Sequence, residues 1–371
     1  MVGEEEAAAV QQVLASGWLT QGERVREFES AVASYVGAKH AVATSSCTTA
    51  LQLSLTALGI GPGDEVICPS LSFIATANAI VHAGATPVFV DIDPVTFNID
   101  PTAVERALTS RTAAIMPVDQ IGLAADIQAI NRIAEKRNIP VVEDAAPAIG
   151  ASIGGRKLGS LSTATCFSFH PRKAITTGEG GVVTTDDDSL AERLRAFRSH
   201  GASVSDLDRH KAADPWFEEY PDVGFNFRMT DIQAAIGVVQ MTRLDGVISE
   251  RRRLAARYAE QLGDLVDVPA DAPGRPHTFQ SYMIRLQEPA RRLDIMKELA
   301  AQGIATRRGV MAIHLEPAYR TRFPDLSLPE TERAAASTMI LPLFPGMTDD
   351  EQDQVVEALR AAIVGRAVPS R

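Results

Sequence analysis

A lysine between two apolar, strand-like runs is the first candidate for chemistry. Lys173 follows Pro171 and precedes a Gly-rich turn at 178–181. Because Pro and Gly punctuate local structure strongly, this lysine is held in a defined place. An amine that attacks a carbonyl must be fixed and partly desolvated, so that its pKa falls and the neutral form becomes available. The alternative is a solvated turn lysine, since lysine is rarely buried.

A second candidate is an acid at the end of an apolar run. Residues 139–142 predict a buried strand, and Glu143 and Asp144 follow it directly. Ligands gather at the carboxyl ends of parallel strands, so Asp144 is a candidate binding residue. The alternative is a capping carboxylate, a role that Asp often takes. Lys173 comes at the end of a later strand of the same alternation, so both groups could face one cleft.

Small hydroxyl residues link an expected strand at 41–44 to an expected helix that starts near residue 50. The segment consists of Ser45, Ser46, Cys47, Thr48 and Thr49. Free N–H groups and hydroxyls at a helix N-terminus can bind phosphate, although a plain N-cap would have the same composition. The chain has no GxxxxGK[ST] loop and no GxGxxG turn between a strand and a helix, which disfavours nicotinamide dehydrogenases.

A phosphate cradle, an acid and a lysine suited to a Schiff base are explained together by pyridoxal 5'-phosphate (PLP). Lys173 would bind this cofactor covalently, Asp144 would keep its ring nitrogen protonated, and the helix terminus would hold its phosphate. An aromatic side chain over the ring would complete the site. Phe73, after the expected strand at 65–68, is the candidate, and an ordinary core phenylalanine is the alternative.

The elements that must position these residues alternate regularly. Apolar runs predict strands at 41–44, 65–68, 86–90, 112–118 and 139–142, and two more at 165–169 and 182–184 flank Lys173. Amphipathic runs predict helices between them, and two helices at 4–16 and 23–36 precede them. This pattern predicts an α/β fold with a mostly parallel sheet of about seven strands, flanked by helices.

The composition changes after residue 240. A charge-rich helix is expected at 244–262, then a strand at 282–286 and helices at 290–302 and 349–363. We therefore expect a large PLP-binding α/β domain at 1–240, which includes the N-terminal helices, and a small α+β domain at 241–371.

Composition excludes several classes of protein. The 371 residues carry a formal net charge of −11, which disfavours nucleic acid or an anionic membrane as the main partner. No apolar run is long enough to span a membrane, and no signal peptide is evident. The cysteines, Cys47, Cys68 and Cys166, form no metal-binding or disulfide pattern. We therefore expect no metal and a cytoplasmic location.

Several ordered blocks resemble the DegT/DnrJ/EryC1/StrS family, the PLP-dependent sugar aminotransferases of fold-type I. Residues 168–173 and 177–181 match its SFHxxK…TGEGG signature. Blocks at 16–22, 69–78, 84–91, 143–146 and 224–229 are also similar to the family. The resemblance thus covers nearly the whole chain.

This resemblance implies roles for individual residues. Lys173 would be the Schiff-base lysine and proton shuttle, Asp144 would pair with the pyridinium nitrogen, and Phe73 would stack on the ring. The phosphate ligands would be Thr48, Thr49, Ser168 and, from the neighbouring subunit, Asn226. The last role implies an obligate homodimer with composite active sites.

The chain departs from the family pattern on the substrate side. Pro147 stands where the family commonly has Gln or His, and 119–122 (Asp-Gln-Ile-Gly) stands in place of His-Leu-Tyr/Phe-Gly. Further on, His314 matches a family histidine, and Arg307 and Arg308 could meet a nucleotide phosphate or a donor carboxylate. We take His314 and Arg308 as candidate substrate-binding residues, with solvated surface arginines as the alternative.

The resemblance implies an aminotransferase that moves an amino group from glutamate or glutamine to a ketone, expected to be a nucleotide-linked keto-sugar. A PLP-dependent sugar dehydratase of the same fold is one alternative, but such relatives carry His at the position of Lys173. A non-catalytic PLP-binding sensor is another. The joint presence of lysine, acid, cradle and aromatic residue disfavours the sensor, and Pro147 leaves it open.

Overall fold

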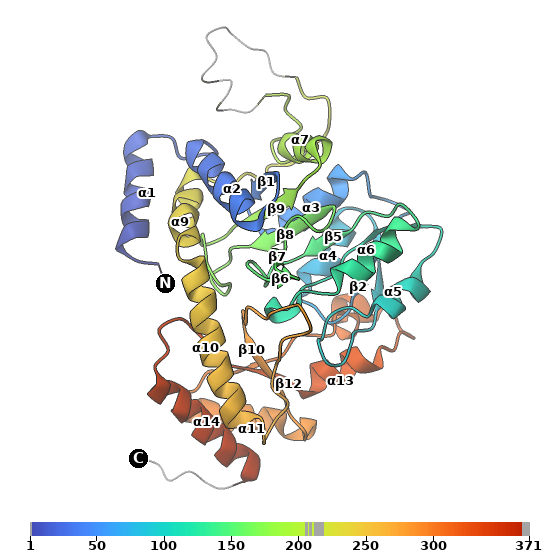
Figure 1. The fold of residues 1–371 in the computed structure, drawn as a ribbon. Coiled ribbons are helices and arrows are strands. Elements are labelled where there is room, and N and C mark those ends of the chain that lie inside the picture. The colour runs from blue at the N-terminus through green and yellow to red at the C-terminus, as the bar shows by residue number, and fades with distance from the viewer. Residues whose placement is uncertain (1, 205–206, 208–209, 211–218, 366–371) are drawn as a thin grey trace.

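The computed structural model describes residues 2–204, 207, 210 and 219–365 (Figure 1). It begins with two helices, α1 (Glu4–Ser16) and α2 (Glu23–Val36), as predicted. Each ends at a glycine with positive φ, 72° at Gly17 and 75° at Gly37, a conformation that strains residues with a Cβ. Both helices pack against α9 (Asp231–Met241).

In the part of the chain that the structure describes, seven strands form the central sheet. They are β1 (His40–Thr44), β2 (Glu65–Pro69), β3 (Thr86–Val90), β4 (Thr112–Ile115), β5 (Val142–Asp144), β8 (Ala164–Ser168) and β9 (Gly181–Thr185). Their order is β1-β9-β8-β5 and β4-β2-β3, and parallel bridges 115–141 and 118–144 join the two groups. Only β9 is antiparallel to its neighbours, β1 and β8. The predicted mostly parallel sheet is therefore confirmed.

Helices cover both faces of this sheet. One face carries α3 (Cys47–Ala57), α4 (Ala75–His82) and α7 (Asp188–Phe197), and the other carries α2, α5 (Pro101–Ala107) and α6 (Ile127–Glu135). Strand side chains alternate between the two cores: Val182 belongs to the core that contains α2 and α6, and Val183 belongs to the core that contains α3 and α7. A short hairpin of β6 (Ser152–Ile153) and β7 (Arg156–Lys157) follows β5.

The elements at 244–364 are called here the C-terminal unit, which lies below the sheet in Figure 1. A three-stranded antiparallel sheet has the order β10 (Tyr282–Arg285), β12 (Thr338–Leu341), β11 (Arg307–Arg308). The helices of this unit are α10 (Leu244–Leu262), α11 (Arg292–Ala301), α12 (Pro317–Arg320), α13 (Pro329–Ser337) and α14 (Asp349–Val364). It also contains the short 3₁₀ turns η2 (Pro289–Arg291) and η3 (Ile313–Leu315). A third 3₁₀ turn, η1 (Gln120–Gly122), follows β4 in the large sheet. Helices α10, α11 and α14 share a separate hydrophobic core with β10 and β12.

Helix α9 ends at Met241 and helix α10 begins at Leu244, so the helical structure stops at residues 242–243, just after the predicted domain boundary at 240. The division into domains at 1–240 and 241–371 stays a prediction. Strand β12, the centre of the C-terminal sheet, was not predicted, because α13 runs into it without an intervening Gly or Pro. Within the described residues, no helix is both long enough and apolar enough to cross a membrane.

Candidate active site

Three strand ends and one helix start lie at the same edge of the sheet. Strands β1, β8 and β5 run in one direction, because β9 is antiparallel to β1 and β8, and β5 is parallel to β8. Their last residues are Thr44, Ser168 and Asp144, and α3 begins shortly after β1. The loop from β8 to β9 leaves the same edge and contains Lys173. The structure thus places Asp144, Lys173 and the start of α3 together.

Asp144 is buried, with 4% of its surface exposed. Its Oδ2 accepts a hydrogen bond from Thr76 Oγ1 at 2.7 Å, and its Oδ1 accepts one from the Ala146 N–H at 3.2 Å. Burial raises the pKa of this carboxyl, while Thr76, Ala146 and the positive charge of Lys173 act to lower it. A buried carboxylate is costly unless it is paired, so a protonated ring nitrogen placed here would be stabilised.

The loop that carries Lys173 is closed by backbone hydrogen bonds. The Phe169 N–H donates to the Gly180 carbonyl at 3.0 Å, and the Thr177 N–H donates to the Phe169 carbonyl at 2.9 Å. Inside the loop, the Lys173 N–H donates to the His170 carbonyl at 2.9 Å. The lysine is therefore part of an ordered turn.

The Lys173 side chain is half-buried. Desolvation lowers the pKa of its ammonium group, and the charge of Arg172 adds to this effect. The Cys47 thiol and the Asp144 carboxyl act to raise the pKa of the Lys173 ammonium group. The balance makes the neutral, nucleophilic amine more available than in a solvated lysine.

Helix α3 begins with a capping box. Ser46 Oγ accepts a hydrogen bond from the Thr49 N–H at 3.2 Å, and the Ser46 N–H donates to Thr49 Oγ1 at 3.1 Å. Gly181 of β9 approaches this helix start so closely that an added Cβ would lie 2.5 Å from the Ser46 carbonyl. Thr49 is thus a capping residue. Thr48 is half-buried and has no side-chain partner among the residues described, so its hydroxyl is available to an anion at the helix terminus.

Ser168 and Phe73 differ sharply in exposure. Ser168 is buried, and its Oγ accepts a hydrogen bond from the His170 N–H at 3.4 Å. Phe73 is 65% exposed and stands just before α4, so it is not a core residue. One ring face is therefore left for another aromatic group.

Asn226 is exposed, and its backbone forms an antiparallel bridge with Ser199. The carbonyl of the next residue, Phe227, accepts a hydrogen bond from the Ser45 N–H at 2.8 Å. The segment 225–227 therefore runs beside the start of α3. The role of Asn226 in a neighbouring subunit stays a prediction.

The two candidate substrate ligands lie in different surroundings. His314 is 1% exposed, with Nδ1 2.7 Å from Ser70 Oγ and Nε2 3.4 Å from Glu332 Oε1. Arg308 is exposed and donates to Glu316 Oε1 at 3.1 Å. Both ring nitrogens of His314 thus contact the chain itself, while the guanidinium of Arg308 remains accessible. Their roles in substrate binding stay predictions.

Sequence reasoning missed the residue that holds Asp144, because Thr76 looks like an ordinary helix residue. Ser72 Oγ and Thr76 Oγ1 are 2.7 Å apart, and both side chains are buried. The only signal is position: Thr76 lies one helical turn after Phe73, in a segment already chosen for that aromatic residue.

A buried pair of carboxyls was also missed. Asp119 and Glu143 are both fully buried. Asp119 Oδ1 accepts from the Ala125 N–H at 2.8 Å, and Glu143 Oε2 accepts from Ser162 Oγ at 2.6 Å. Burial raises the pKa of both, and the charge of Glu143 raises that of Asp119 further. Adjacent buried carboxyls cannot both ionise readily, so we expect the pair to hold one proton, on Asp119, whose pKa the charge of Glu143 raises further.

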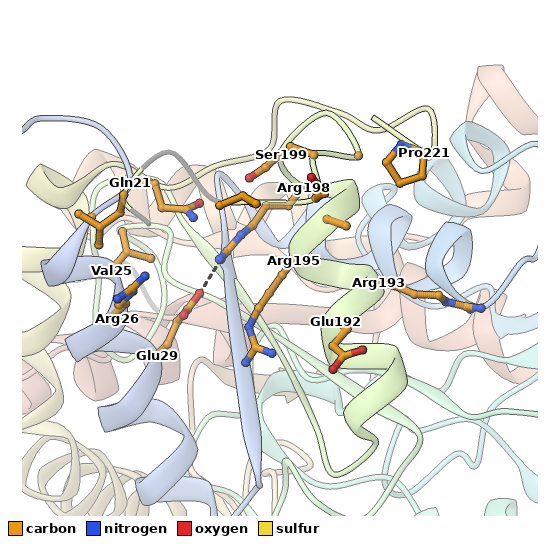
Figure 2. Close-up of a pocket in the computed structure, with 17 residues that line it drawn as sticks. Gln21, Val25, Arg26, Glu29, Glu192, Arg193, Arg195, Arg198, Ser199 and Pro221 are labelled. Carbon is orange, nitrogen blue, oxygen red and sulfur yellow. Dashed lines mark hydrogen bonds and ion pairs between the residues drawn. The ribbon is translucent and has the colours of Figure 1, made fainter. Parts of the chain in front are cut away.

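A cavity of about 790 Å³ opens between α2, α7 and the segment 199–204 (Figure 2). Arginines 26, 193, 195 and 198 line it, and Arg198 forms an ion pair with Glu29. None of the predicted site residues is among its lining residues. This cavity therefore lies apart from the site at Lys173.

The residues at the sheet edge fit PLP on three grounds. First, the start of α3 offers N–H groups and the hydroxyl of Thr48 to a phosphate. Second, the carboxyl of Asp144 is buried, and its charge is only partly compensated by its neighbours. Third, the amine of Lys173 is half-buried nearby. Together with the sheet topology, these features are those of a PLP-dependent aminotransferase of fold-type I.

Comparison with known proteins supports this class. The chain belongs to the DegT/DnrJ/EryC1/StrS aminotransferase family, whose model matches residues 1–360. This confirms the resemblance, the enzyme class and the dependence on PLP.

Three relatives illustrate the similarity. The spore coat polysaccharide biosynthesis protein SpsC of Bacillus subtilis (strain 168) is 40% identical, over 98% of this chain and 96% of the relative. The crystal structure of S. venezuelae DesV with a ketimine intermediate is 36% identical, with a TM-score of 0.89 over 96% of this chain and 93% of that one. The PMP-form of the putative sugar aminotransferase Spr1654 from Streptococcus pneumoniae is 29% identical, with a TM-score of 0.93 over 99% and 98%.

Proposed function

We propose that the protein transfers an amino group from glutamate or glutamine to the keto group of a nucleotide-linked sugar. The observation that carries this proposal is the half-buried amine of Lys173 beside the buried carboxyl of Asp144, next to the start of α3. The names of SpsC and Spr1654, which refer to polysaccharide biosynthesis and sugar amination, support a sugar as the acceptor.

PLP, when bound, supplies a carbonyl that condenses with amines and a ring that withdraws electrons. Asp144 would stay ionised against the ring nitrogen, since a cation there compensates its burial. Lys173 Nζ, as a neutral amine, would take the proton from the carbon that bears the amino group and return it during transfer. Phe73 would cover one ring face and exclude water from it.

The phosphate would lie at the start of α3, where helix N–H groups point outward. Thr48, Thr49 and Ser168 would contribute hydroxyls, and Asn226 of a second copy would complete the cradle. Thr49 is the least available of these groups, because its hydroxyl donates to the Ser46 carbonyl at 2.7 Å and its N–H donates to Ser46 Oγ at 3.2 Å.

We also propose a homodimer with composite active sites. Large apolar side chains are exposed near the site edge in the single chain, among them Phe73 at 65%, Val223 at 93% and Leu315 at 46%. Exposed apolar groups of this kind favour an interface, and Val223 lies close in sequence to Asn226.

The three cysteines are free and buried, which supports a reducing compartment such as the cytoplasm.

For the substrate we propose Arg308 as a ligand of a nucleotide phosphate or of the donor carboxylate. Its ion pair with Glu316 is exposed and therefore weak enough to exchange for a ligand. His314 would shape the same wall through its contact with Ser70 rather than by a free ring nitrogen.

The proposal is tested by locating the lysine that binds PLP. The protein is incubated with PLP and reduced with borohydride, and the modified peptide is identified by mass. Release of 2-oxoglutarate from L-glutamate, and in parallel of 2-oxoglutaramate from L-glutamine, then measures the first half of the transfer. Lys173→Ala is expected to abolish both signals, and Lys297→Ala, an exposed lysine on α11, is the control. Modification of another lysine, or amino transfer by Lys173→Ala, would contradict the assignment.

A further inference from the structure

The C-terminal unit contacts the edge of the central sheet that carries Asp144 and Lys173 through a short backbone junction. The Thr278 N–H donates to the Gly122 carbonyl at 2.9 Å, and the Gln280 N–H donates to the Ile121 carbonyl at 2.9 Å. The segment 278–280 leads directly into β10, the first strand of the C-terminal sheet. The junction therefore ties that sheet to the loop after β4.

Both sides of the junction contain strained backbone. Ile121 has φ 60° and Phe279 has φ 49°, a region in which β-branched and bulky residues are rare. Gly122 has φ 102°, and a Cβ there would lie 2.3 Å from Thr278 Oγ1. For Ile121 and Phe279 such a conformation is costly and persists only where surrounding contacts enforce it. Strain of this kind points to a functional constraint at this place.

A buried arginine enforces the geometry from the other side. Arg251 of α10 is 5% exposed, and its Nη1 donates to the carbonyls of Phe279 at 3.1 Å, Gln280 at 2.9 Å and Leu343 at 3.3 Å. Among the described residues, three carbonyl oxygens and no carboxylate accept from this guanidinium. The backbone of residue 280 is thus fixed through both its N–H and its carbonyl.

The side chain of Gln280 carries this rigidity to the lysine. Gln280 Nε2 donates to the Arg172 carbonyl at 2.6 Å. That carbonyl and the Lys173 N–H belong to one peptide unit, and the N–H donates to the His170 carbonyl at 2.9 Å. Both polar groups of the peptide that precedes the Lys173 Cα are therefore engaged, which fixes the peptide plane and the direction in which the lysine side chain leaves it.

We propose that Gln280 is a positioning residue for Lys173, through which the C-terminal unit sets the orientation of the amine. This inference rests on the proposed role of Lys173 in amino transfer. Gln280 touches the peptide of the lysine loop and acts on the chemistry only through that peptide. An exposed hydrogen bond of this type contributes little to global stability, so its loss affects mainly the geometry of the loop.

Three variants separate positioning from packing. Gln280→Met keeps the length of the side chain and removes the donor, and Gln280→Glu turns the donor into an acceptor that repels the Arg172 carbonyl. Gln302→Ala is the control, because its side-chain amide donates to the Glu298 carbonyl of α11, far from the lysine loop in sequence. If Gln280 acted only by packing, the isosteric variant Gln280→Glu would behave like the wild type. If Gln280 positions the lysine loop through its N–H donor, Gln280→Glu would lose this function.

The first readout is hydrogen exchange of the cofactor-free protein. In Gln280→Met and Gln280→Glu the amides of residues 172–178 are expected to exchange faster than in the wild type, with β10 and α14 unchanged. The second readout is amino transfer from L-glutamate, for which we expect a rate roughly three- to tenfold lower at unchanged KM, with the larger loss in Gln280→Glu.

The outcomes are distinct. Wild-type exchange in Gln280→Met, or faster exchange together with wild-type transfer rates, overturns the proposal. If the wild-type protein does not bind PLP at Lys173, the proposed function fails, and the exchange of the cofactor-free loop still decides whether Gln280 holds the lysine turn.

Discussion

Replacing Asp119 by Asn tests whether the buried carboxyl pair holds a proton. In the folded protein the pKa of Asp119 and that of Glu143 are both raised, chiefly by burial. In the unfolded chain both groups titrate near pH 4, at about their ordinary values. At pH values between these ordinary values and the folded pKa of Asp119, the folded pair therefore keeps a proton that the unfolded chain has released.

The sign of the effect follows from this difference. A raised folded pKa contributes stability that is fully present below the unfolded pKa and is lost as the pH rises toward the folded pKa. One proton changes the free energy of unfolding by about 1.4 kcal/mol per pH unit. From about pH 5 to about pH 7 the wild type would lose up to roughly 2.7 kcal/mol from this source. Asp119→Asn removes the group that takes up this proton, so the loss due to Asp119 disappears.

Urea unfolding of the cofactor-free protein, at fixed protein concentration and several pH values, measures the slope. Asp144 and Asp231 also have raised pKa values and are present in both proteins. The difference between the two slopes therefore reports Asp119 together with its interactions with Glu143 and Asp144. Asp325→Asn, an exposed substitution, is the control. A wild type and an Asp119→Asn variant with parallel pH profiles would refute the shared proton.

Two further substitutions probe the cofactor site. Gly181→Ala places a Cβ 2.5 Å from backbone at the start of α3, so we expect a loss of about 1–3 kcal/mol in unfolding free energy and weaker PLP retention in dialysis; Gly246→Ala, with open space around it, is the control, and equal behaviour would contradict the close packing. Thr76→Val removes the hydrogen bond that most lowers the pKa of Asp144, so the acidic limb of the activity profile should move to higher pH. Thr56→Val, which removes a helix-internal bond on α3, should leave that limb in place, and an unmoved limb in Thr76→Val would show that Asp144 does not govern it.

Much of the fold could be predicted because its signals are local. The strands of the sheet are short apolar runs bounded by helices, and the lysine loop is marked by its own Pro and Gly residues. Contacts between distant segments were beyond that reasoning. Thr76 reaches Asp144, and Gln280 reaches the carbonyl of Arg172, across long stretches of chain, and neither contact leaves a periodic or compositional trace. The carboxyl pair likewise depends on two strands lying side by side.

The antiparallel strand β9 has a consequence for biosynthesis. Strand β1 pairs only with β9 within the described residues, with His40 opposite Thr185, so it emerges from the ribosome long before its partner exists. At roughly 5–20 residues per second, this strand waits about 7–30 s with an unpaired edge. Nascent chains cut before residue 185 should therefore recruit chaperones or aggregate, and completion of β9 should release them.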